Sequence, residues 1–167
     1  LASGQVRRDL HFRLDVFRIE LTIAPRGEAA AAHVHPRQEQ TFDIVSGRLA
    51  VTTRGAPRIL QPNDRFVLPP NTAHTQGNPF EEPVVAIETY RPARQMHEFF
   101  EVFFTMGARG MTNAKGVPSL LYVVALFDEY AESILPGRLV DRVLVRVLGH
   151  GHQQRAPRAA GAQGARP

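Results

Sequence analysis

Residues 27–47 read GEAAAAHVHPRQEQTFDIVSG, and this stretch decides the fold of the chain. At its centre lie His33 and His35, two imidazoles separated by a single residue. In an extended strand, the side chains of residues i and i+2 point to the same face. A helix over the preceding alanines would put the two rings on different faces. We therefore predict a strand that sends both imidazoles into one cavity.

A third imidazole, His74, follows the turn-rich segment 68–73, which contains two prolines and an asparagine. Gln40 lies between these histidines, near the start of a second predicted strand that ends at Gly47. Three histidines from separate segments suit a divalent metal that keeps positions open for solvent or substrate. The chain has no cysteine, so imidazole, amide or carboxylate groups must supply the ligands of any metal.

The spacing of these residues resembles the two motifs of the cupin family. The first motif, G-x5-H-x-H-x3,4-E-x6-G, is matched by Gly27, His33, His35 and Gly47. The second, G-x5-P-x-G-x2-H-x3-N, is matched by Pro69, His74 and Asn78. Asn63 and Asn71 replace both glycines of the second motif, and asparagine tolerates the left-handed conformation that turn glycines adopt. The resemblance covers residues 12–92.

Gln40 is the departure from the family pattern that matters most. It stands where cupins usually carry a metal-binding glutamate, whereas the nearest carboxylate, Glu39, comes one residue early. One residue along a strand means the opposite face, so we expect Gln40 to face the cavity and Glu39 to face away. The resemblance then implies a metal ligand set of His33, His35, Gln40 and His74. The alternative is a site that has lost its metal.

Short apolar runs alternate with clusters of Gly, Pro, Asn and Asp, which indicates an all-β sandwich or barrel. No helical pattern separates the strands, which excludes parallel βαβ units. Together with the resemblance, this predicts a cupin double-stranded β-helix, a jelly-roll barrel, over residues 1–92. The alternation changes phase between Val16 and Phe17, which predicts a bulge or a strand break there.

Beyond Arg91-Pro92 the periodicity becomes helical, and we predict a C-terminal α-helical extension over residues 93–148. Its helices are expected from about residue 93, from Pro118 to a break at Pro136, and over 138–148. The second carries an apolar stripe of Leu120, Leu121, Val124, Phe127 and Tyr130. We expect these helices to pack on the barrel or on a partner in a homodimer. The apolar run is too short to cross a bilayer.

The net charge of +4 comes largely from residues 149–167, which hold three arginines and no acid. The rest of the chain is nearly balanced, with 17 basic and 16 acidic residues. A tail of this composition cannot bury enough apolar surface to order itself, so we expect it to be disordered. We expect no specific nucleic-acid partner and no membrane. The chain has no secretory signal pattern at its start, and we expect a cytoplasmic protein.

Four further residues are candidates for a substrate pocket: Phe42, Phe66, Gln76 and Tyr90. Core packing explains an aromatic residue in a strand equally well. No catalytic residue is assigned. Three neutral imidazoles and a neutral amide would leave the double charge of the metal undiminished, which strengthens it as a Lewis acid. The sequence does not select among Fe, Ni, Zn and Mn.

Cupins with the same His-His-Gln-His pattern include sugar-acid ring-opening enzymes and polyketide cyclases. The resemblance therefore implies a metal-dependent enzyme that acts on an oxygen-rich small molecule by isomerisation, cyclisation or elimination, or by dioxygenation. The alternative is a non-catalytic cupin that binds a small ligand or has a regulatory role, with a degenerate metal site. Helices that cap the barrel mouth would favour a closed reaction site.

Overall fold

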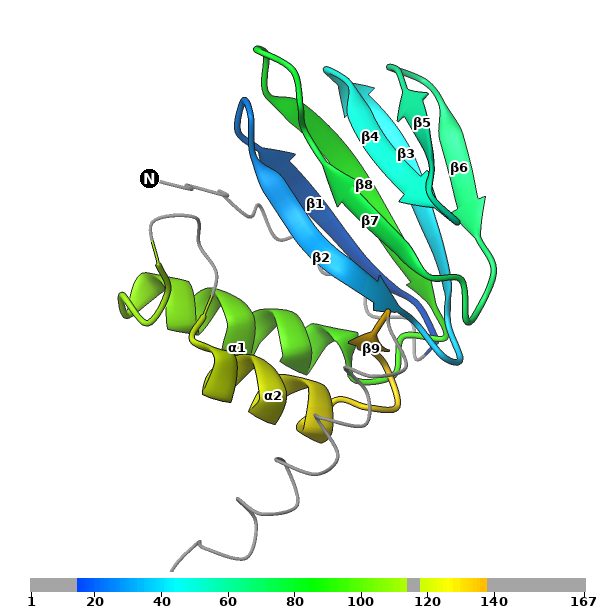
Figure 1. Cartoon of the computed structure of the whole chain (residues 1–167). Coiled ribbons are helices and arrows are strands. Elements are labelled where there is room, and N and C mark those ends of the chain that lie inside the picture. The colour runs from blue at the N-terminus through cyan, green and yellow to red at the C-terminus, as the bar shows by residue number, and fades with distance from the viewer. Residues whose placement is uncertain (1–14, 114–117, 138–167) are drawn as a thin grey trace, which may run out of the picture.

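The computed structural model describes residues 15–113 and 118–137 (Figure 1). Within these ranges the chain forms nine strands and two helices. The first eight strands are β1 (Phe17–Ile23), β2 (Glu28–Val34), β3 (Glu39–Ser46), β4 (Leu49–Thr53), β5 (Ala56–Leu60), β6 (Arg65–Leu68), β7 (His74–Gly77) and β8 (Val84–Arg91). The helical region follows with α1 (Met96–Ala108), α2 (Leu120–Glu129) and the short strand β9 (Leu135–Pro136).

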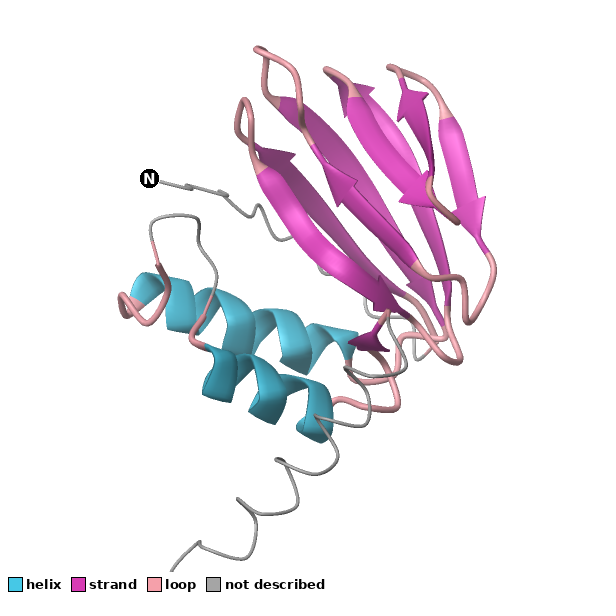
Figure 2. Cartoon of the chain, viewed as in Figure 1, coloured by secondary structure: helices cyan, strands magenta, loops and turns pink. Residues whose placement is uncertain are grey.

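The strands form two antiparallel sheets with the orders β1-β8-β3-β6 and β5-β4-β7-β2-β9. Figure 1 shows the sheets as two layers, and the non-consecutive strand neighbours are those of a jelly roll. The two helices lie together at the end of the layers where β2 and β8 finish (Figure 2). The predicted fold class, an all-β cupin core with a C-terminal helical extension, is confirmed.

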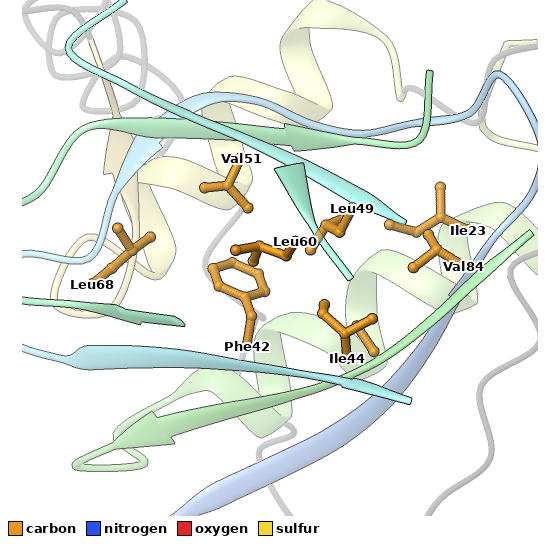
Figure 3. Close-up of a cluster of buried hydrophobic side chains, with 9 residues drawn as sticks. Ile23, Phe42, Ile44, Leu49, Val51, Leu60, Leu68 and Val84 are labelled. Carbon is orange, nitrogen blue, oxygen red and sulfur yellow. The ribbon is translucent and has the colours of Figure 1, made fainter. Parts of the chain in front are cut away.

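Alternating residues of both sheets fill the space between the layers. Phe42 and Ile44 of β3 face Leu49 and Val51 of β4, and Leu60 of β5 closes the group (Figure 3). All five are at most 4% exposed. Burying an aliphatic or phenyl side chain fully stabilises a fold by about 1.5–3 kcal/mol. This cluster therefore fixes the spacing of the layers and the face that each neighbouring polar residue presents.

Two asparagines serve the turns for which the family motif uses glycine. Asn63 has φ 71° and Asn71 has φ 63°, both left-handed as predicted. Gly47 has φ 71°, and a Cβ there would lie 2.3 Å from the carbonyl oxygen of Pro83. The turn after β3 therefore requires glycine for space as well as for conformation.

The helical region packs on the barrel and on itself through two apolar clusters. Met96 of α1 joins Phe17, Ile19 and Tyr90 of the first sheet. The C-terminal half of α2 contributes Leu126, with Tyr130 and Ile134 beyond it, to a cluster that also contains Phe99, Phe103, Met106 and Phe127. The limits of the predicted domains stay a prediction.

The second predicted helix differs from the structure at both ends. It stops at Glu129, well before Pro136, and the chain turns into β9, a strand that we did not predict. Leu120 and Leu121 are 65% and 75% exposed, so these two residues of the predicted stripe are not buried within this chain, and their packing on a partner stays a prediction. They lie in the first turn of α2, whereas the packed cluster takes its residues from the other end of that helix.

Several predictions fall on residues 1–14 and 138–167, outside the described part of the chain. They are the strand before the phase change, the third helix and the tail. None of the helices within the described ranges is long and apolar enough to cross a membrane.

Candidate metal centre

The backbone pairing of β2 with β7 places His33 directly opposite His74. Their ring centroids are 4.2 Å apart, and the His35 ring lies 5.0 Å from His33 and 5.7 Å from His74. All three side chains are buried, and one nitrogen of each lies within 4.8 Å of the others. The structure thus brings the three predicted imidazoles into one cluster.

Two backbone carbonyl groups fix the tautomers of two rings of this cluster, His35 and His74. Nδ1 of His35 lies 2.7 Å from the Ser133 carbonyl oxygen, and Nδ1 of His74 lies 3.0 Å from that of Thr72. A carbonyl oxygen can only accept, so each Nδ1 carries the proton and donates it. The Nε2 atoms of both rings are then bare acceptors, and neither has a hydrogen-bond partner within the described residues. This is the form in which imidazole binds a metal.

Burial keeps these rings neutral. The pKa of His35 is lowered from 6.5 to about 4, mainly by burial; the bond to the Ser133 carbonyl partly opposes this effect, and the nearby His74 ring adds to it. Burial also lowers the pKa of His74, against the bond to Thr72. Desolvation disfavours the charged imidazolium, so both rings stay ready for a metal at neutral pH.

Gln40 reaches the same region from the facing sheet. It is 1% exposed, whereas Glu39 is only half-buried, which agrees with the predicted faces of β3. Its Nε2 donates to the Tyr90 hydroxyl at 3.0 Å and to Oε2 of Glu88 at 3.2 Å. The Tyr90 ring lies 5.0 Å from that of His35, which places this network beside the imidazoles. The Gln40 Oε1 atom is buried without a partner in the described part.

Glu88 of β8 is a buried carboxyl group that we did not predict as part of the site. It is 1% exposed and accepts hydrogen bonds from the Tyr90 hydroxyl at 2.5 Å and from Nε2 of Gln76 at 2.6 Å, besides that from Gln40. Burial raises the pKa of Glu88 to about 7, against these three bonds. The alternation of β8 could have identified Glu88 as an inward-facing residue, because it shares the buried phase of Ala86 and Tyr90.

The donor atoms fit a divalent metal. Three imidazoles cluster, and the bare Nε2 atoms of His35 and His74 and the unpaired Oε1 of Gln40 are buried acceptors. Buried polar atoms are nearly always satisfied in proteins. A set of nitrogen and neutral oxygen donors of this kind is typical of Zn, Fe, Ni and related ions. The three histidines could therefore hold a metal ion.

The four predicted pocket residues do not all lie at this centre. Gln76 and Tyr90 take part in the Glu88 network, and the Phe42 ring lies 6.4 Å from that of His74. Phe66 instead packs against the barrel core, with the Arg58 guanidinium 4.9 Å from its ring centre. Their role towards a substrate stays a prediction.

Residues 19–90 match the family model described as the cupin domain. No curated protein matches the chain significantly. Among solved structures, the chain is similar to a Klebsiella pneumoniae protein with a double-stranded β-helix domain (23% identity over 56% of this chain and 83% of that one, TM-score 0.49). The chain is also similar to KdgF from Halomonas sp., at 24% identity over 56% of this chain and 80% of that one, with a TM-score of 0.49.

A sugar phosphate isomerase of the cupin superfamily from Silicibacter pomeroyi is also similar, at 16% identity and a TM-score of 0.43. That match covers 46% of this chain and 50% of the isomerase, so the chain spans half of its length.

Proposed function

The chain belongs to the cupin superfamily through its residues 19–90, and on that premise we propose that it is a metal-dependent enzyme acting on an oxygen-rich small molecule. The proposed reactions are isomerisation, cyclisation or elimination, with dioxygenation as the redox alternative. The observation that carries the proposal is the cluster of three buried imidazoles whose nitrogens lie within 4.8 Å of one another. In the proposal, Gln40 adds the fourth ligand.

A divalent metal held by His33, His35, His74 and Gln40 would polarise an oxygen of a bound small molecule and lower the pKa of a hydroxyl group attached to the metal. The chain's own residues prepare the site for this. The carbonyl groups of Thr72 and Ser133 orient two of the imidazoles, and burial excludes bulk water from all three. Tyr90 holds its hydroxyl proton towards Glu88 while the tyrosine ring packs against His35.

The helical region supports an enzyme over a simple binding module. The Ser133 carbonyl comes from the segment that links α2 to β9, 98 residues away from His35 in the chain. β9 itself pairs with β2 at His33 and Val34. The segment from Ser133 to β9 therefore contacts the candidate metal centre, which supports a reaction site shielded from solvent.

Metal analysis tests the centre directly. The full chain carrying His150→Ala and His152→Ala, so that these histidines add no metal, should contain about one Fe, Ni, Zn or Mn ion after reconstitution. A further His74→Ala change should remove it, because one of the three clustered imidazoles is lost. The matched control is His97→Ala on α1, which should keep the metal. A parent chain that takes up none of the four ions would support the lost-site alternative.

Turnover then separates the reaction classes. The loaded protein would be incubated with hydroxylated sugar acids and with polyketide-type substrates while dissolved oxygen is recorded. We expect conversion without oxygen uptake, abolished by His74→Ala. Oxygen uptake coupled to conversion would establish dioxygenation instead. Saturable binding without conversion across the panel would favour the non-catalytic ligand-binding alternative.

A further inference from the structure

Glu88 accepts hydrogen bonds from its buried neighbours and so decides which end of each neighbouring amide group faces it. Its two oxygens accept from side chains of both sheets: Oε1 from Gln76 on β7, and Oε2 from Gln40 on β3 and from the Tyr90 hydroxyl. The Glu88 side chain is 1% exposed, so these neighbours shield it from bulk solvent.

An amide group has one donating and one accepting end, so its orientation follows from what it faces. Because Glu88 accepts, the neighbouring Gln40 must present Nε2 to it and direct Oε1 elsewhere. The reversed amide would place its own oxygen about where Nε2 now lies, 3.2 Å from a carboxyl oxygen, with two acceptors in contact. The orientation therefore depends on the acceptor at position 88.

The same orientation holds when the carboxyl group carries a proton. The Tyr90 hydroxyl donates to Oε2, whereas Oε1 accepts from Gln76 and has a second lone pair, which can bind a proton without displacing the bonds to Oε2. Gln40 and Gln76 then still donate to Glu88. The inference thus stands on the hydrogen-bond geometry alone.

We propose that Glu88 is a positioning residue of the metal centre: it accepts from the Gln40 amide and so turns the oxygen of that amide towards the metal as the fourth ligand. The inference rests on the proposed metal function, and it gives Glu88 a role that acts only through Gln40. Gln76 fixes the other oxygen of Glu88 by its 2.6 Å bond and keeps the carboxyl group in place.

A polarity swap tests the proposal. In Glu88→Gln, the new amide oxygen can still accept from Gln76, but its NH2 group then faces Gln40, which must reverse and direct its own NH2 at the metal. We expect Co²⁺ affinity to fall about tenfold or more, as for other residues that orient metal ligands. Adding Gln40→Glu restores an acceptor opposite that NH2 group and a free oxygen for the metal. The double variant should recover Co²⁺ affinity to within about threefold of the parent chain, a small deficit beside the roughly tenfold loss expected for Glu88→Gln alone.

The measurements are Co²⁺ titration of the metal-free full chain and the visible absorption of the Co²⁺ complex, which reports the ligand set. The surface control is Glu82→Gln, which removes an exposed carboxylate bonded to Arg48 and should change neither. A double variant that binds Co²⁺ as weakly as Glu88→Gln would overturn the proposal, and so would an unaltered affinity in Glu88→Gln. Absence of Co²⁺ binding by the parent chain would instead refute the metal function itself.

Discussion

At the scale of single residues, His74 and Asn78 belong to the same motif but have different roles. His74 presents a bare nitrogen to the candidate metal centre, whereas Asn78, four residues later, is a structural residue. The Asn78 side chain is 1% exposed, and its Nδ2 donates to the carbonyl oxygens of Ile23, Ala24 and Glu82. Its Oδ1 accepts from the Phe80 backbone N–H. One amide therefore ties the turn after β1 to the loop before β8.

Replacing Asn78 by Ala should destabilise the protein by about 2–4 kcal/mol, because it leaves several buried backbone groups unpaired at once. Urea unfolding followed by circular dichroism measures the change. The matched control is Gln61→Ala, at an exposed side chain, which should change the free energy of unfolding by no more than about 0.5 kcal/mol. A loss below about 1 kcal/mol in Asn78→Ala would show that water replaces the lost bonds.

At the scale of elements, the strand β9 links the helical region to the candidate metal centre. Gly137, directly after β9, donates its backbone N–H to the Ala32 carbonyl oxygen at 2.8 Å. A Cβ on Gly137 would lie 2.9 Å from the backbone carbonyl carbon of Ala32 and 3.1 Å from its Cβ. The close approach of these two segments therefore needs glycine, and it holds the Ser133 carbonyl near His35.

Changing Gly137 to Ala should push β9 away from β2, destabilise the protein by about 1–3 kcal/mol and weaken Co²⁺ binding by disturbing His35. The control is Gly107→Ala in α1, where a Cβ would meet nothing within 4 Å. That change should stabilise the protein by up to about 1 kcal/mol, since alanine favours a helix over glycine. Urea unfolding and Co²⁺ titration of both variants check this. Unchanged Co²⁺ affinity in a destabilised Gly137→Ala chain would show that β9 does not influence the candidate metal centre.

At the scale of the whole molecule, one helix side chain packs both against the barrel and between the helices. Phe99 of α1 packs against the cluster formed by Phe17, Ile19, Tyr90 and Met96, and also against the cluster between the helices. Its ring lies 5.5 Å from Phe100 and 5.8 Å from Tyr130. A residue that belongs to both clusters couples their stabilities, so we expect the described parts to unfold as one unit.

Phe99→Ala should lower the free energy of unfolding by about 2–3 kcal/mol, less than for a fully buried phenylalanine. Hydrogen exchange should then speed up in α1 and in β8 together. The control is Val102→Ala, at a side chain that is 38% exposed on the same helix and should have little effect. Faster exchange confined to the helices would show that the extension unfolds by itself.

The sequence by itself predicted the features that depend on local order. The alternation of apolar residues predicted the strands, and the spacing of His33 and His35 predicted a shared face. Counting to Gly47 predicted that Gln40 turns inward and Glu39 does not. The left-handed turns at Asn63 and Asn71 followed from the tolerance of asparagine for that conformation.

Only the tertiary structure decided the rest. His35 donates to the backbone carbonyl of Ser133. Every residue has such a carbonyl group, so the residue types in the sequence give no sign of this bond. The Glu88 network joins residues of three strands and two sheets, so no local pattern reveals it. The helix α2 ends at Glu129, and the chain then pairs β9 with β2, a contact between segments about a hundred residues apart. Strand periodicity acts between near neighbours, whereas these hydrogen bonds form only after distant segments have been folded against one another.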